Sequence, residues 1–142
     1  MFSSSMFPSG PPISLLKVAG EPLLSSLDTQ CYRVLRIGSF TCPISALVRM
    51  SIDETVVKTC DSARRDIGPW STVKQGGTKP ELFELLRKIM TIESERFDPE
   101  QPWQGKMDGA YYIAECNDED SYLTMTLETS DHLHEVFEEF GL

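Results

Sequence analysis

The sequence predicts an α+β fold: a mostly antiparallel sheet of five or six strands, with one long helix and one C-terminal helix packed on one face. Two observations predict it. Short segments rich in β-forming residues are separated by turn residues, and two other segments repeat their apolar residues at helical spacing. The length of 142 residues suits one domain. We therefore expect a flexible N-terminal arm at residues 1–28 and a single α+β domain at residues 29–142.

The strands are expected to form a meander followed by a hairpin. Apolar and polar side chains alternate through residues 44–52, which indicates one buried and one wet face, so the sheet face away from the helices is expected to stay partly open. The hairpin turns at the acidic residues 117–120. The expected strands are residues 31–37, 44–52, 55–60, a short edge strand at 70–74, then 110–116 and 123–127.

A long helix is expected to run to about Arg96. Thr78 and Glu81 have the spacing of a capping box, and Pro80 suits a first helical turn. The final helix should begin near residue 130 or 131 and end at Gly141. The apolar stripes of the two helices are Leu82, Leu85, Leu86, Ile89, Met90 and Phe97 in the first, and Leu133, Val136, Phe137 and Phe140 in the second.

The N-terminal arm contains Ser, Pro and Gly, with one short packed piece expected at residues 13–18 or 23–27. It lacks a basic start, and Pro8, Pro11 and Pro12 interrupt its first apolar stretch, so it is not typical of a signal peptide or a membrane helix. We therefore expect a cytoplasmic protein.

Charge is distributed unevenly along the chain. Residues 1–97 carry 12 basic and 10 acidic side chains, whereas residues 98–142 carry 12 acidic side chains and only Lys106. Nucleic acids and anionic membranes require clustered Lys and Arg, so neither is an expected partner. A basic protein partner suits the acidic part, because opposite potentials speed encounter. The alternative is that the acidity only maintains solubility.

The cysteines and histidines do not predict a metal site. Cys31, Cys42, Cys60 and Cys116 contain no Cys-x-x-Cys pair and are expected to be reduced core residues, with a Cys31–Cys42 bridge as the alternative. His132 lies two residues from His134, which places the two on different sides of a helix. We expect no metal and no cofactor.

Catalytic motifs are absent from the sequence as well. It contains neither a Gly-x-Ser-x-Gly elbow nor a nucleotide-binding loop, so we expect no catalytic residues. The alternative is a small enzyme or ligand-binding domain that uses the open sheet face. Its polar groups would be Asp108, Glu115, Tyr112 or His132.

Two features favour a protein-binding surface. Trp103 and Asp108 lie in a Gly-containing loop before a strand that begins near Tyr112, and Trp is enriched at interface hot spots. An acidic belt follows, for which a solvated face is the alternative reading. The belt consists of Asp118, Glu119 and Asp120, with Glu135, Glu138 and Glu139 on the final helix.

The residues Tyr32-Arg-Val-Leu, Ser39-Phe40 and Pro43, then Trp103, then Asp108-Gly-Ala110 before Tyr112-Ile-Ala-Glu115, resemble a group of small uncharacterised bacterial proteins. The likeness covers about residues 31–142. Val34 stands where the group has an aromatic residue, and Met107 where it has Leu. The resemblance implies no catalytic residues.

In size, acidity and lack of catalytic motif, the chain is also similar to bacterial immunity proteins, which are small cytoplasmic α+β proteins that bind and block a cognate toxin. This likeness implies a basic protein toxin as the partner. The expected function is therefore an immunity or inhibitor protein, with an adaptor or structural subunit, such as a homodimer through a strand edge, as a further alternative.

Overall fold

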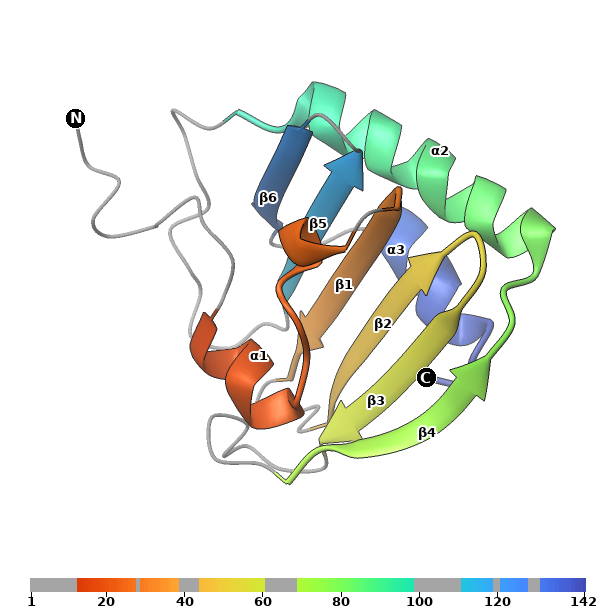
Figure 1. Ribbon diagram of the computed structural model, residues 1–142. Coiled ribbons are helices and arrows are strands. Elements are labelled where there is room, and N and C mark those ends of the chain that lie inside the picture. The colour runs from red at the N-terminus through yellow and green to blue at the C-terminus, as the bar shows by residue number, and fades with distance from the viewer. Residues whose placement is uncertain are drawn as a thin grey trace.

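Six antiparallel strands form one sheet in the computed structural model, which describes residues 13–27, 29–38, 44–60, 69–98, 111–118, 121–127 and 131–142. The order across the sheet is β4-β3-β2-β1-β5-β6, and Figure 1 shows helices on both of its faces. The predicted α+β class, with its long helix and C-terminal helix, is confirmed. The strands are β1 (Cys31–Ile37), β2 (Ser45–Ser51), β3 (Thr55–Cys60), β4 (Ser71–Gly76), β5 (Tyr111–Asp118) and β6 (Ser121–Leu127).

Strand β1 lies at the centre of the sheet and is buried along its whole length. It pairs with β2 on one side and β5 on the other, and its alternate side chains point to opposite faces. Tyr32 and Val34 join the core beneath the long helix and the C-terminal helix, whereas Leu35 and Ile37 join a second, smaller core on the opposite face. The sheet is therefore packed on both sides.

The main core lies between the sheet and helices α2 (Pro80–Arg96) and α3 (Asp131–Glu138), which run behind the sheet in Figure 1. The Tyr32 ring packs on Phe83 with the ring centres 5.7 Å apart, and the Tyr112 ring packs on Phe137 at 5.9 Å. Burying each large apolar side chain contributes about 1.5–3 kcal/mol before its entropy cost. This packing fixes both helices on the sheet.

The start of α2 differs from the predicted capping box. Lys79 occupies the N-cap position, and its side chain makes no capping hydrogen bond. The Thr78 hydroxyl donates instead to the Ser51 carbonyl at 2.7 Å and lies 2.8 Å from the Thr55 hydroxyl. Thr78 therefore ties the helix entry to the β2–β3 hairpin, which explains why it does not cap the helix.

The end of α3 agrees with the sequence. Gly141 has a φ of +74°, the left-handed conformation that glycine adopts most readily at a helix end. The following residue, Leu142, packs against the main core, and its main-chain oxygen accepts a hydrogen bond from Arg36 at 3.0 Å. The Arg36 guanidinium also lies 5.0 Å from the centre of the Phe137 ring.

The opposite face of the sheet is covered rather than open. Helix α1 (Ile13–Ala19) and the short 3-10 helix η1 (Leu24–Ser26) lie in front of it in Figure 1. Leu16 and Leu24 are buried, as are Leu35 and Leu47 on the sheet beneath. The predicted wet face of residues 44–52 was wrong, because residues 13–27, which we call the N-terminal segment, cover it.

Both pieces of the arm that the sequence suggested as alternatives are therefore packed elements. Residues 1–12 and 28 lie outside the described residues. The side chain of Asn117 donates to the carbonyls of Leu24 at 3.1 Å and Leu27 at 3.2 Å, which anchors η1 to the end of β5. Apolar contact and hydrogen bonds thus both hold the N-terminal segment on the sheet.

If the N-terminal segment is part of the core, Leu24→Ala should lower the free energy of unfolding by about 2–5 kcal/mol, because it leaves a cavity at a fully buried site. Its neighbour Leu23 is 42% exposed, so Leu23→Ala should change the stability by less than about 0.5 kcal/mol. Urea unfolding of both variants measures the difference. Equal stabilities would contradict the packing of this segment.

Candidate functional site

A row of charged residues crosses the covered face of the sheet. Glu115 on β5 lies directly opposite Arg33 on β1, which in turn lies opposite Arg49 on β2. Like charges placed opposite each other in a sheet are destabilising. The pair of arginines therefore needs more than one carboxylate. Glu115 supplies the one beside Arg33.

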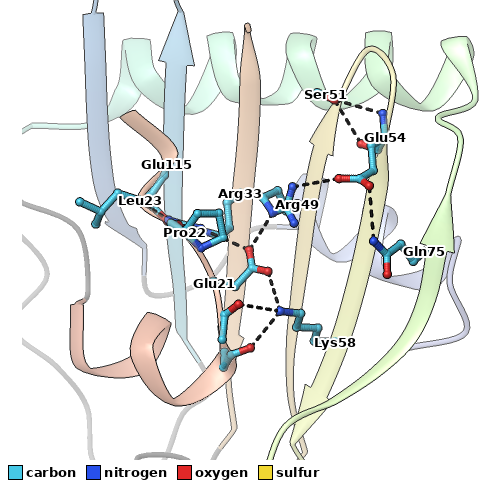
Figure 2. Close-up of polar contacts among 12 residues, drawn as sticks. Glu21, Pro22, Leu23, Arg33, Arg49, Ser51, Glu54, Lys58, Gln75 and Glu115 are labelled. Carbon is cyan, nitrogen blue, oxygen red and sulfur yellow. Dashed lines mark hydrogen bonds and ion pairs between the residues drawn. The ribbon is translucent and has the colours of Figure 1, made fainter. Parts of the chain in front are cut away.

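The second carboxylate comes from Glu21, in the turn between α1 and η1. Figure 2 shows its side chain among three cations from three neighbouring strands. Its Oε1 lies 2.8 Å from Nε of Arg49 and 3.3 Å from Nη1 of Arg33, and its Oε2 lies 2.7 Å from Nζ of Lys58 on β3. The Glu21 side chain is fully buried in this position.

Arg33 is fully buried and holds partners on both sides. Its Nε and Nη2 donate to the two carboxylate oxygens of Glu115 at 2.6 and 3.0 Å, the bidentate geometry that the planar guanidinium favours. Its Nη1 donates to the carbonyl of Pro22 at 2.6 Å. Arg33 therefore joins the sheet to the N-terminal segment.

The network continues toward the β6 edge. The Tyr122 hydroxyl donates to Glu115 Oε1 at 2.5 Å and accepts from the Thr124 hydroxyl at 2.7 Å. Burial raises the pKa of Tyr122, and the hydrogen bond to the Glu115 carboxylate raises it further. Tyr122 therefore stays protonated and donates its hydroxyl proton to Glu115 while it accepts from Thr124.

On the other side the network reaches solvent. The Lys58 ammonium donates to the Ala19 carbonyl at 2.9 Å, and Arg49 Nη1 donates to Glu54 Oε1 at 3.3 Å. The side chains of Arg49, Lys58 and Glu54 are 15%, 12% and 45% exposed. Gln75 on β4 also contacts Glu54, at 3.4 Å. The cluster is thus buried at Arg33 and opens toward β3 and β4.

The three carboxylates and three cations balance. Burial alone would raise the pKa of Glu21, but the hydrogen bonds and positive charges of Arg49 and Lys58 outweigh it, and the pKa lies below its usual value of 4.5. Burial lowers the pKa of Arg49, and the Glu21 carboxylate more than offsets this. The Glu21 carboxylate is therefore ionised at neutral pH and serves as the counter-charge of Arg49 and Lys58.

The thiols of the described residues are not arranged for chemistry. Cys31 and Cys60 are buried and Cys116 is half-buried, and none of the three forms a disulfide; Cys42 lies outside the described residues. Burial and the neighbouring carboxylates of Glu115 and Asp118 raise the pKa of Cys116 to about 12. Such a thiol carries almost no thiolate at neutral pH and is unreactive.

The described residues contain no group of three His, Cys, Asp or Glu side chains placed to hold a metal ion. Of the described helices, none is long and apolar enough to cross a membrane. A small hollow of about 20 Å³ lies between β4 and the ends of α2 and α3, and Lys74, Lys79 and Glu139 line part of it.

The residues predicted to bind a partner fall in different places. Trp103, Asp108, Glu119 and Asp120 lie outside the described residues. Tyr112 is only 7% exposed and packs in the main core against Phe137, so its ring is not available to a partner. Asp118, Glu135, Glu138 and Glu139 are exposed.

The exposed members of the acidic belt are not all brought together. Asp118 lies at the hairpin end of β5, whereas α3 follows the opposite end of β6. The length of β6, about 20 Å, therefore separates Asp118 from the start of α3. Glu135, Glu138 and Glu139 form one surface by themselves.

The polar groups of the alternative ligand site do not converge either. Glu115 and Tyr112 are on opposite faces of β5, the first in the ion network and the second in the main core. His132 is exposed on α3, and Asp108 lies outside the described residues.

The ion network was not predicted from the sequence. Arg33 and Arg49 are both flanked by apolar residues in predicted strands, which is a usable signal that their charge is buried and paired. Glu21 gives no such signal, because its role depends on how the N-terminal segment folds back across β1, β2 and β3.

The chain was compared with models of protein families, with curated proteins and with solved structures, and none of the three comparisons gave a match. The proposed function therefore rests on the described surfaces alone.

The ion network predicts a pH-dependent stability. The folded pKa of Glu21 is depressed, so its contribution is fully present above the unfolded pKa and is lost as the pH falls through the folded pKa. Glu21→Gln should cost about 3 kcal/mol at pH 7, and the gap to the wild type should shrink below about pH 4.5. Unfolding at several pH values measures this, with the exposed Glu95→Gln as control. A gap that does not change with pH would contradict the assignment.

Arg33 and Glu115 should behave as a coupled pair. Arg33→Met leaves Glu115 buried without its bidentate partner and should cost about 3–5 kcal/mol. Adding Glu115→Leu removes the unpaired charge, so the double variant should be more stable than Arg33→Met alone. Chemical unfolding of the two single variants and the double variant gives the coupling energy. A double variant whose losses simply add would rule out the pairing.

Proposed function

We propose that this protein is a non-catalytic binding protein that recognises a basic protein partner through the acidic side of α3. The specific role proposed is that of an immunity or inhibitor protein that neutralises a cognate toxin. One observation carries the proposal: three exposed glutamates are fixed together at the C-terminal end of a helix, where their charge is unfavourable for the protein itself.

The placement of these glutamates follows from helix geometry. Leu133, Val136 and Phe137 are fully buried and hold α3 against the sheet. The set Glu135, Glu138 and Glu139 has the same spacing, shifted by two residues, which rotates it by about 200° to the outer side. The helical turn continues to Glu139, whose amide donates to the Glu135 carbonyl at 3.3 Å. The three carboxylates therefore share one outward surface, which we call the α3 acidic surface.

This surface costs stability in the free protein. Like charges three and four residues apart on a helix repel, and carboxylates at a helix C-terminus interact unfavourably with the helix dipole. The last turn of α3 contains no basic residue. Lys74 and Lys79 line the hollow beside Glu139, and His134 Nε2 lies 3.6 Å from Glu138 Oε1, so the charge of this surface is offset only in part. A cationic partner would relieve both, so the arrangement favours binding over a structural role.

The rest of the described structure provides a rigid base for the α3 acidic surface. The ion network uses its charges internally, and the hollow beside Glu139 is too small to hold a substrate. A binding protein needs a fixed surface of this kind more than it needs a cavity.

The partner can be tested by co-expression with the product of the adjacent gene, as a toxin and its immunity protein are expected to be neighbours. The wild type should form a complex that weakens as salt is added and should rescue growth. The triple variant E135Q/E138Q/E139Q should bind roughly threefold to 150-fold more weakly, since exposed charge pairs contribute about 0.2–1 kcal/mol each.

The matched control is E81Q/E84Q/E95Q, which removes the same charge from exposed positions on α2. It should bind like the wild type. The α3 triple variant should also be at least as stable as the wild type in thermal unfolding, because it removes repulsion. Absence of any complex, or equal loss of binding in both triple variants, would refute the proposal.

A further inference from the structure

The ion network also contains an anion-binding arrangement that the protein fills with its own side chain. Arg33, Arg49 and Lys58 project from β1, β2 and β3, and all three contact the single carboxylate of Glu21 (Figure 2). We call these three residues the basic cradle. Its occupant belongs to the N-terminal segment rather than to the sheet, so the sheet face alone would present three cations around an empty position.

The cradle is built for a carboxylate. Its cations reach both oxygens of Glu21, with Arg49 and Arg33 on Oε1 and Lys58 on Oε2. The carboxylate of Glu21 is fully buried, and such contacts are stronger in a buried position than in water. Two arginines and a lysine around one carboxylate form a recognition site typical for anionic groups.

The cradle is accessible from one side. Arg49 and Lys58 remain 15% and 12% exposed. The hydrogen bonds of Arg49 to Glu21 and Glu54 use two of its five N–H groups. An anion from solvent can therefore approach these two side chains without removing Leu16 or Leu24 from the sheet.

The main chain around Glu21 allows its side chain to leave. Glu21 lies outside both α1 and η1, and Gly20 before it has a φ of +70°, a conformation that glycine tolerates at no cost. The apolar anchors Leu16 and Leu24 lie on either side of this turn. Lys58 and Arg33 donate to the carbonyls of Ala19 and Pro22 on either side of Glu21, so the main chain stays in place when the Glu21 side chain rotates out of the cradle.

We propose that the basic cradle of Arg33, Arg49 and Lys58 is a binding site for an external carboxylate, and that Glu21 occupies it in the ligand-free protein. The ligand class is a carboxylate, either of a small organic acid or of an acidic side chain of another protein. This site is separate from the α3 acidic surface and does not depend on the function proposed for it.

The test uses Glu21→Ala in the full chain, with acetate as the probe. The substitution removes one methylene group and the carboxylate, and acetate supplies a methyl group and a carboxylate in their place. At ten times its dissociation constant, acetate should raise the Tm of Glu21→Ala by about 4 °C more than chloride at equal ionic strength. Glu54→Ala, which removes a rim carboxylate, should respond equally to both salts, and E21A/R49M should lose the acetate response. Equal effects of acetate and chloride on Glu21→Ala would overturn the proposal.

If Glu21→Ala does not fold, hydrogen exchange of the wild type decides the question. The amides of Gly20 and Glu21 donate to the carbonyls of Lys17 and Leu16 at 3.2 and 2.9 Å. Displacement of Glu21 should make these two amides exchange several times faster in acetate than in chloride, while the amides of β1 stay unchanged. Identical exchange in the two salts would then exclude an external ligand.

A final comparison separates the two sources of carboxylate. The blocked peptide Gly-Glu-Gly carries an acidic side chain, and Gly-Gln-Gly is its uncharged control. A response to the peptide at lower concentration than to acetate would identify a protein side chain as the ligand. A response to acetate alone would identify a small organic acid.

Discussion

The carboxylate of Glu21 is the interaction on which the arrangement of the sheet depends. Arg33 and Arg49 are placed opposite each other by the strand register, and Lys58 lies on the next strand. Two or three cations on a covered sheet face would be unstable without a counter-charge, because an unpaired buried charge costs several kcal/mol. Glu21 contacts all three, so the cover of the face and its neutralisation come from the same turn of the chain.

This dependence explains why the N-terminal segment is part of the folded domain. Apolar contacts of Leu16 and Leu24 hold it at two points, and Glu21 fixes its position between them. Apolar burial gives little directional preference, whereas a carboxylate that must meet three donors permits few alternatives. The ion network therefore specifies how the segment crosses the strands, while the two cores provide most of the stability.

Much of the fold could be predicted from the sequence. Strands β1 and β3 were predicted with their observed ends, and α2 and α3 follow from their apolar spacing. The open face was wrong because alternation within 44–52 shows which side chains are polar but not whether they are covered. The charge of Lys58 suggests a solvent-exposed side chain when its strand is considered alone, and only the fold brings Glu21 to it.

The candidate site was less predictable for the same reason. Glu135, Glu138 and Glu139 could be placed on one surface because helical spacing is local. The sequence does not show which ends of β5 and β6 meet α3. It therefore could not show that Asp118 lies apart from these glutamates or that Tyr112 is in the core. The likeness to small bacterial proteins and to immunity proteins remains a prediction, since the comparisons gave no match.

The α3 acidic surface and the basic cradle differ in how far the protein neutralises their charge. The α3 acidic surface presents charge that the protein neutralises only in part, and the basic cradle contains charge that Glu21 neutralises. Both depend on a rigid sheet, and the rigidity of its second face depends on Glu21.

The most direct test of this account is an NMR titration of the Glu21 side-chain carboxyl carbon. The account predicts a pKa below the usual 4.5, because the Arg49 and Lys58 hydrogen bonds outweigh the effect of burial. Signals from the Arg33 and Arg49 guanidinium groups should shift with the same midpoint. A Glu21 pKa at or above 4.5, with arginine signals that do not respond, would show that this carboxylate does not occupy the cradle.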